Sequence, residues 1–430
     1  MIIHVVEQGD TVQSIADSYG VPIDLIISDN GVVVTRGDLI PGQTIVITFP
    51  EQIHVVKSGE TLQDIAINNN ISLLDLLKNN PYLSDRQYIY PGDTLIISYG
   101  DKIRSVTTNG YTSGFIDIPT LKKTLPYLTY LSIFGYRVVG DGQVIGIDDT
   151  EILQLANLYQ VAPIMIITTL STLGQENVEN AYTILNSEAN MDRLIDNLIV
   201  ELKAKGYYGI NITYELLSNL TLSAYEVFNE KAYTRFKKEG LAYIITIAPN
   251  IVFTATEITF EKVDYSKIVN QADQIVILNY LWGTYLGPPA PVASISKINE
   301  FLDYMLTMVL PEKITLGLPL FGYDWELPYI IGLTKANLIS LTSALLLAKQ
   351  YSDEILFDPA SQTPYYTYNT STEGIPFEQI VWFIDARIID EALKIITERG
   401  LKGIGLWNIA GFIPQLWTVI NTQYDIERIT

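Results

Sequence analysis

The sequence predicts an α/β protein: a TIM (β/α)8 barrel with a small insertion after strand seven, preceded by two βααβ modules. Two observations predict this architecture. The first hundred residues contain an internal repeat, and from about residue 102 short apolar segments alternate with amphipathic ones. The 430-residue chain is long enough for a barrel-sized core and two appended units. We therefore expect modules at 1–50 and 51–100 and the barrel at 101–430.

The N-terminal repeat consists of two matched pairs of segments: IHVVEQGDTVQSIA (3–16) with IHVVKSGETLQDIA (53–66), and PGQTIVI (41–47) with PGDTLII (91–97). Each copy begins with an apolar strand and a Gly-containing turn, continues through two helical stretches and ends in a strand after Pro-Gly. Thr11 and Thr61 stand at the predicted helix starts, where a hydroxyl can accept from a free backbone N–H. We expect both threonines to be helix N-caps.

The barrel prediction depends on eight strand candidates: 104–111, 128–136, 163–170, 209–215, 242–249, 274–280, 314–322 and 403–409. Amphipathic helices fit between them, for example at 191–206, and eight strand-helix units over roughly 330 residues match a TIM barrel with insertions. The longest interval, 323–400, contains an aromatic and proline-rich segment at 358–369. We interpret this interval as the insertion after strand seven.

The composition excludes several classes of function. A net charge of −21 without clusters of Lys and Arg argues against nucleic-acid binding, and no apolar run reaches the roughly 18 residues of a membrane span. Since the chain has no Cys and two His, we expect no metal site and no cofactor. His4 and His54 occupy the same repeat position, where packing or surface roles are expected. The start, MIIHVVEQGDT, lacks a basic region and a cleavage site, so no secretory signal peptide is expected.

The segment GYYGINITYE (206–215) is the most informative stretch for function. Because side chains alternate along a strand, Asn211, Thr213 and Glu215 share one face. A carboxylate at the C-terminal end of a barrel strand lies where TIM barrels place their chemistry. We therefore expect Glu215 to lie in the mouth of the barrel.

Aromatic and polar residues at or near the ends of other predicted strands would converge on the same mouth. Indole and phenol rings with a few polar groups suit a sugar, whose C–H faces stack on rings while its hydroxyls form hydrogen bonds. The candidate residues around Glu215 are Tyr280, Trp282, Asp324, Trp325, Asp385 and Trp407. The alternative interpretation for each of them is packing or solvation without contact to a ligand.

The repeat resembles the LysM module, which binds N-acetylglucosamine-containing glycans such as peptidoglycan and chitin. In that family the sugar lies in a shallow groove between the first strand-helix loop and the loop before the last strand. The resemblance therefore implies two sets of groove residues: Asp10, Thr11 and Ile40 in the first copy, and Glu60, Thr61 and Tyr90 in the second. The alternative is that these residues only form turns and cap helices.

The barrel resembles family 18 glycoside hydrolases, whose strand-four signature is Asp-x-x-Asp-x-Asp-x-Glu. The segments ILNYLWGTYLGPPAPVASI (277–295) and GLWNI (405–409) look like the SleL/YaaH-type branch, in which two LysM modules precede a barrel that trims spore cortex peptidoglycan. The resemblance implies a substrate-assisted mechanism, in which the sugar's own acetamido group attacks the anomeric carbon. It makes Glu215 the general acid, Tyr280 the acetamide contact and Trp407 the floor of the sugar subsite.

The sequence departs from the family signature at the residues that assist the acid. Thr213 replaces the aspartate two residues before Glu215, and Asn211 replaces the earlier aspartate. Leu281 replaces the aspartate that follows the tyrosine on strand six. Threonine can form a hydrogen bond but carries no charge, and losing one preorganised electrostatic partner costs about 10²–10³ in rate. The sequence thus predicts a catalytic acid without its usual helpers.

Three functions are compatible with these observations. The first is a spore-associated protein that binds N-acetylglucosamine-containing polysaccharide and has weak or lost hydrolase activity. The second is an active N-acetylglucosaminidase that cleaves spore cortex peptidoglycan, and the third is a non-catalytic structural protein of the spore envelope. Without a signal peptide, synthesis in the mother-cell cytoplasm and deposition on the spore would bring the modules to their glycan. The sequence does not indicate whether the chain associates with itself.

Overall fold

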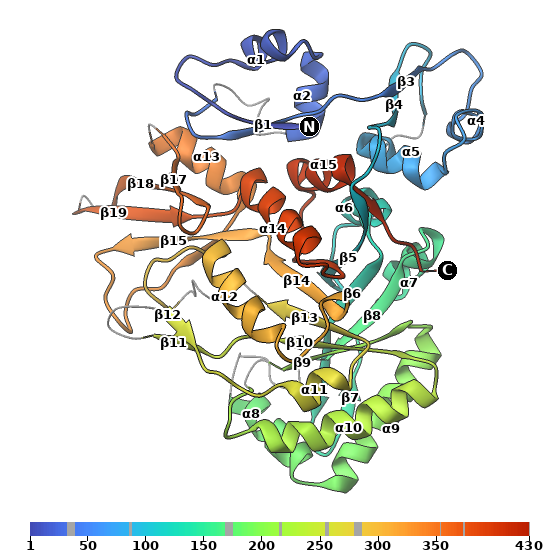
Figure 1. Ribbon diagram of the computed structural model, residues 1–430, viewed down its shortest axis with the longest axis vertical. Coiled ribbons are helices and arrows are strands. Elements are labelled where there is room, and N and C mark those ends of the chain that lie inside the picture. Colours follow the sequence, from blue (N-terminus) through green and yellow to red (C-terminus); the bar gives the residue numbers. More distant parts are fainter. Residues whose placement is uncertain are drawn as a thin grey trace.

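The computed structural model describes residues 1–31, 39–85, 88–167, 175–214, 217–253, 258–278, 286–352, 354–372 and 375–429. Figure 1 shows a large barrel surrounded by helices and, above it, two small N-terminal modules. The first module packs against helix α15 (Pro414–Gln423), and the second packs against helix α6 (Ile118–Thr124). In the part of the chain that the structure describes, no helix is both long and apolar enough to cross a membrane.

Each N-terminal module is a βααβ unit closed by a two-stranded antiparallel sheet, which confirms the predicted repeat. The elements of the first module are β1 (Ile2–Val5), α1 (Val12–Tyr19), α2 (Ile23–Asn30) and β2 (Thr44–Ile47). Those of the second are β3 (Gln52–Val55), α4 (Leu62–Asn68), α5 (Leu73–Asn79), the 3₁₀ turn η1 (Pro81–Asp85) and β4 (Thr94–Ser98). Thr11 and Thr61 are the N-caps of α1 and α4, as predicted, and each accepts a hydrogen bond from the backbone N–H three residues on.

Eight parallel strands form a closed barrel, in which each strand pairs with the next and the last pairs with the first. In order around the ring they are β5 (Arg104–Ser113), β6 (Tyr130–Val139), β8 (Ala162–Ile167), β9 (Gly209–Tyr214), β10 (Ala242–Ile247), β13 (Gln274–Leu278), β14 (Ile314–Pro319) and β20 (Gly403–Trp407). A barrel strand therefore stands at each of the eight predicted positions, while the predicted ends 168–170, 215 and 279–280 lie outside the described residues. The predicted strand 314–322 is too long, because the Leu320 N–H donates to the Trp407 carbonyl and Phe321 already begins a strand outside the barrel.

Helices cover the outside of the barrel and bury one apolar face against it. Helix α9 (Glu188–Lys205) shows the pattern, since Leu194, Leu198 and Leu202 recur at a spacing of four residues and are buried. The remaining elements of the barrel domain are η2 (Leu125–Tyr127), β7 (Gln143–Ile145), α7 (Thr150–Leu158), α8 (Gln175–Leu185), α9 (Glu188–Lys205), α10 (Leu222–Lys238), β11 (Ile251–Phe253), β12 (Ile258–Phe260), α11 (Ser266–Asn270), α12 (Ile295–Met305), η3 (Pro311–Lys313), α14 (Ala386–Glu398) and β21 (Tyr424–Ile426).

The insertion after strand seven is a five-stranded antiparallel sheet with one helix, which confirms that an insertion follows this strand. The predicted interval 323–400 is too long, because the sheet ends at Trp382 and α14 is one of the outer helices of the barrel. The sheet order is β16-β15-β19-β18-β17. Its elements are β15 (Phe321–Leu327), β16 (Asn337–Ser340), α13 (Leu341–Tyr351), β17 (Leu356–Asp358), β18 (Thr363–Thr372) and β19 (Ile375–Trp382). Figure 1 shows this sheet between the barrel and the first module.

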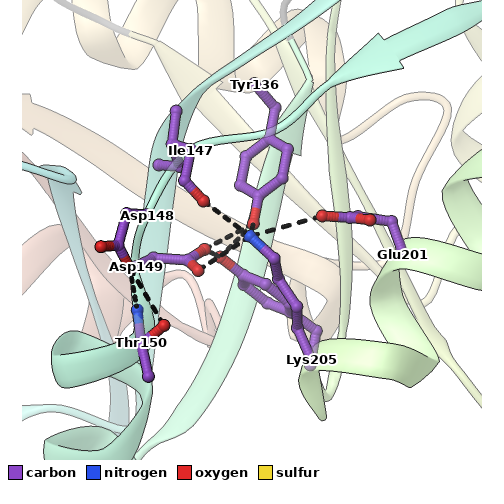
Figure 2. A network of polar contacts seen from close by, with 8 residues as sticks. Tyr136, Ile147, Asp148, Asp149, Thr150, Glu201 and Lys205 are labelled. Atoms are coloured by element: carbon purple, nitrogen blue, oxygen red, sulfur yellow. Dashed lines mark hydrogen bonds and ion pairs between the residues drawn. The ribbon is translucent and has the colours of Figure 1, made fainter.

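A buried polar network joins the segment before α7 to helix α9 (Figure 2). The Asp149 carboxylate accepts hydrogen bonds from the hydroxyls of Tyr136 and Tyr207. Lys205 Nζ lies 3.0 Å from Asp149 Oδ1 and also donates to the Ile147 carbonyl at 2.7 Å. Because both ions of the pair are hydrogen-bonded within the chain, we assign this network a structural role on the outside of the barrel.

The two modules differ in the hydrophobic cluster to which their buried residues belong. Buried residues of the first module, such as Ile26 and Ile45, belong to the same hydrophobic cluster as the barrel. The second module has a separate cluster of its own, centred on residues such as Ile65 and Leu95. The first module is therefore part of the barrel's core, whereas the second is a nearly independent unit.

Candidate functional site

The predicted mouth of the barrel is described only in part. The candidate acid Glu215 lies just beyond the last residue of β9 and outside the described residues. Tyr280, Leu281 and Trp282, which follow β13, also lie outside them. The roles of these residues stay predictions. The described part of the mouth comes from the barrel strands and the insertion around them.

Strand β9 has the two faces that the sequence predicts. Asn211 is fully buried and Thr213 is 6% exposed. The Asn211 side chain accepts a hydrogen bond from the Thr246 hydroxyl at 2.8 Å and donates to the Tyr111 hydroxyl at 3.4 Å, both on other barrel strands. Tyr214 lies on the opposite face, because its hydroxyl donates to Asn229 on the outer helix α10. Thr213 therefore belongs to the lumen face, at the mouth end of the strand.

The buried polar side chains of the barrel strands are neutral. Among the described residues, every buried polar side chain on the eight barrel strands is a Thr, Ser, Asn or Gln. Burial raises the pKa of Tyr111, so that its hydroxyl also stays uncharged. These groups can hydrogen-bond an amide or a hydroxyl, but they cannot balance a developing positive charge as a carboxylate would.

Aromatic rings line the mouth beside β20. Trp407 is partly buried and stacks on Phe134 with the ring centroids 5.0 Å apart, and Tyr111 lies 5.4 Å from the same indole. Phe321 and Tyr323 at the start of the insertion pack against the same cluster. The sequence identified Trp407 but not Phe134 or Phe321. Phe134 lies within the predicted second strand, and its aromatic character was the available signal.

The insertion sheet presents a second group of rings. Its register places Tyr323, Trp382 and Tyr365 side by side on one face, and Trp382 stacks on Tyr365 with centroids 4.4 Å apart. Trp382 and Tyr323 pack against the same cluster as Trp407. Trp325 shares this face but is fully buried, and its indole N–H donates to the Gly287 carbonyl at 3.0 Å. Trp325 therefore contributes packing to the base of the insertion.

The structure does not bring the two predicted aspartates to this aromatic face. Asp324 alternates with Tyr323 along β15, so it lies on the opposite face, where it accepts a hydrogen bond from Tyr368. Burial raises the pKa of the Asp324 carboxyl. The Asp385 carboxylate caps α14 by accepting a hydrogen bond from the Arg387 backbone N–H, and it also forms an ion pair with the Arg387 guanidinium at 2.6 Å. Both carboxylates are thus engaged by the scaffold.

The predicted groove residues of the first loops have the same arrangement in both modules. The Asp10 carboxylate accepts from the Glu7 N–H at 2.8 Å and lies 3.0 Å from His4 Nε2, and these two contacts lower the pKa of Asp10. In the second module, His54 Nε2 lies 2.8 Å from the Glu60 carboxylate, which also accepts a hydrogen bond from the Lys57 N–H. These contacts lower the pKa of Glu60. Both histidines thus hold the first loop in place.

The predicted groove residues of the second loops differ. Ile40 in the first module is 5% exposed, whereas Tyr90 at the same place in the second is 61% exposed. In the described ranges, no three His, Asp or Glu side chains lie close enough together to hold a metal ion.

Comparison with known proteins matches every part of this architecture. The model for glycosyl hydrolases family 18 matches residues 105–411, and the LysM domain model matches residues 4–48 and 54–98. A similar protein is the "Cortical fragment-lytic enzyme" of Bacillus subtilis (strain 168). It is 31% identical over 309 residues, which cover 72% of this chain and 71% of the relative.

Two solved structures have the same domain arrangement. The spore cortex-lytic enzyme SleL of Bacillus megaterium QM B1551 superimposes with a TM-score of 0.79 at 27% identity, and the match covers 100% of this chain and 99% of that one. The SleL of Bacillus cereus gives a TM-score of 0.78 at 28% identity, with 99% of both chains covered.

Proposed function

Because this chain belongs to glycosyl hydrolase family 18 and carries two LysM domains, we propose that it binds N-acetylglucosamine-containing glycan of the peptidoglycan type. Binding uses the LysM domains and the aromatic mouth of the barrel, and hydrolysis by the barrel is weak or lost. The observation that carries the second part is Thr213, which stands on the lumen face of β9 where the family signature has an aspartate.

The surroundings of Thr213 support weak hydrolysis. The substrate-assisted route needs a charged group that orients the acetamide and balances the oxazolinium ion. The buried side chains of the described barrel strands supply only neutral partners, among them Asn211 and Thr246. Stacking on Trp407 needs no charge. Sugar binding therefore survives the loss of the carboxylate more readily than catalysis does.

A second candidate function is an active N-acetylglucosaminidase with Glu215 as general acid. Two observations favour it: the glutamate of the signature is retained, and a relative with 31% identity is named a cortical fragment-lytic enzyme. In that case Thr213 would orient the acetamide by hydrogen bonding alone.

One assay separates the two functions: release of reducing sugar from cortex fragments or chito-oligosaccharides by the wild type and by Glu215→Gln. We expect a wild-type rate close to background and little further loss in Glu215→Gln. Adding the missing charges in Thr213→Asp with Leu281→Asp should raise the rate, by about 10²-fold or more for each restored partner. A robust wild-type rate that Glu215→Gln abolishes would instead establish the active enzyme.

We further propose that the protein acts at the spore, where it is deposited after synthesis in the mother-cell cytoplasm. Two solved structures that match along the whole chain are named spore cortex-lytic enzymes, and this supports the placement. A fluorescently tagged copy should appear on the forespore. Accumulation on vegetative cell walls with none on spores would overturn the placement.

A further inference from the structure

The loop before the last strand of the first LysM module is covered by the barrel domain. The Pro41 carbonyl accepts a hydrogen bond from the Ile355 N–H of the insertion at 2.8 Å. At Gly42 the approach is so close that a Cβ atom would lie 1.9 Å from the Ile355 carbonyl oxygen. Ile40 is buried in the same hydrophobic cluster as Ile355. This side of the first groove is therefore occupied by the chain's own backbone.

Two further segments of the barrel domain hold the same module. Arg387 at the start of α14 donates to the Gly42 carbonyl at 3.3 Å, while its guanidinium lies over the Phe357 ring of the insertion. Gln415 on α15 donates to the Thr44 carbonyl at 2.7 Å and to the Asn30 side chain at 2.9 Å. Because these contacts come from three different segments, the first module is fixed in one orientation.

The same loop of the second module is open. Tyr88 and Tyr90 are 69% and 61% exposed, and a Cβ atom at Gly92 would meet nothing within 4 Å. The second module contacts the barrel domain elsewhere, through α5, where the Lys78 carbonyl accepts from Tyr127. Among the described residues, its second loop therefore faces solvent.

The first loops do not account for this difference. Gly9 and Gly59 both border open space. Asp10 and Glu60 both accept a hydrogen bond from the backbone N–H three residues earlier. Among the predicted groove residues, the contrast between the modules is therefore confined to the second loop, one half of the groove that a glycan needs.

We propose that the second LysM module alone offers an open glycan groove, with Tyr88 and Tyr90 as its sugar-stacking rings, and that the first module serves as the dock that joins the barrel. Exposed phenol rings suit the C–H face of a pyranose. The first module has a buried Ile40 at this place, followed by a Pro41 that is bonded to Ile355, and so it offers no such face. This inference rests on the proposed function, since it assigns the LysM part of that binding to one module.

Hydrogen exchange on the full-length chain tests the inference with a hexamer of N-acetylglucosamine as probe. The first loops, 7–11 and 57–61, are largely exposed in the free protein, so both can report a bound glycan. We expect added hexamer to slow exchange in 57–61 and in 88–93, with no change in 7–11. Slower exchange in 7–11 as well would overturn the inference while leaving the proposed function intact.

The remaining outcomes separate the two proposals. Protection at the barrel mouth with none in either module would overturn the inference and the LysM part of the proposed function, while glycan binding by the barrel would stand. If neither exchange nor calorimetry detects binding of the hexamer or of peptidoglycan fragments anywhere in the chain, the proposed function fails together with it.

A double variant tests the two rings directly. Tyr88→Ala with Tyr90→Ala should raise the hexamer concentration needed for half-maximal protection of 57–61 by about tenfold. Tyr182→Ala is the matched control, since Tyr182 is a similarly exposed tyrosine on α8 of the barrel domain, and it should leave that midpoint unchanged. An unaltered midpoint in the double variant would refute the assignment of the rings. Because Tyr88 and Tyr90 are both exposed, circular dichroism should show an unchanged fold in the double variant.

Discussion

The two LysM modules share a fold and a capping pattern, yet they pack differently against the barrel domain. All four residues of β2 in the first module are buried, whereas β4 in the second is only partly covered. The first module joins the barrel's hydrophobic cluster, and the second keeps its own. A sequence repeat therefore determines the fold of each copy, while the contacts around each copy determine which of its surfaces can bind a ligand.

The largest expected effect comes from a matched pair of glycine substitutions in the second loops. Gly42 and Gly92 both have positive φ, so alanine strains either backbone by about 1–2 kcal/mol. At Gly42 the new methyl group would also collide with the Ile355 carbonyl, and such overpacking costs about 1–3 kcal/mol more. We expect Gly42→Ala to lower the free energy of unfolding by about 3 kcal/mol, and Gly92→Ala by about 1 kcal/mol.

Urea unfolding measures the loss in Gly42→Ala, because the first module shares the barrel's core. Hydrogen exchange of β4 measures the loss in Gly92→Ala, because the second module can open by itself. Circular dichroism before unfolding should confirm that each variant folds. Equal losses in the two variants would contradict the docking of the first module against Ile355.

The next effect is a pH dependence that only the first module should have. Asp29 at the end of α2 is buried and accepts a hydrogen bond from Thr48 at 2.6 Å, and its burial raises the pKa of its carboxyl to about 7. The equivalent residue of the second module is Asn79, which does not titrate. Lys78, Tyr99 and Tyr127 are other ionisable groups near Asp29, and burial keeps both tyrosines neutral by raising their pKa values.

The direction of this pH dependence follows from the linkage between proton binding and folding. A carboxyl whose folded pKa is raised stabilises the fold fully below its unfolded pKa, and this contribution is lost as the pH rises through the folded value. Between about pH 5.5 and about pH 8.5 the wild type should lose about 2 kcal/mol of stability through Asp29. Asp29→Asn should remove this slope, as measured by urea unfolding at both pH values. A slope that persists in Asp29→Asn would assign the pH dependence to another group.

Much of the fold followed from local patterns in the sequence. The period of two in GINITY placed Asn211 and Thr213 on one face of β9, and the hydroxyls of Thr11 and Thr61 marked two helix starts. The ends of the strands were harder to predict. The predicted seventh strand ran past Pro319 because apolar residues continue into β15, and only the pairing partners show where the barrel ends.

The parts that the sequence did not predict depend on contacts between distant segments. Asp324 was expected at the mouth because it follows strand seven, but the register with β19 places it behind the sheet. Likewise, the repeat made Ile40 and Tyr90 equivalent, although Ile40 is buried in a loop that is bonded to Ile355 and Tyr90 is exposed. The apolar side chain of Ile40 was the available hint, since an isoleucine where the other copy has a tyrosine favours burial.

The smallest effect tests the similarity of the modules instead of their difference. Thr11 and Thr61 each accept from a backbone N–H, at 3.0 and 3.1 Å, and each cap is completed by a reciprocal side-chain contact. Replacing either threonine by alanine should cost about 1 kcal/mol. In Thr11→Ala the loss should appear in global unfolding, because the first module shares the barrel's core. In Thr61→Ala it should appear as faster hydrogen exchange of α4, because the second module can open by itself. Faster exchange confined to α1 in Thr11→Ala would show that the first module also opens independently, and the distinction between a docked and a free module would then be lost.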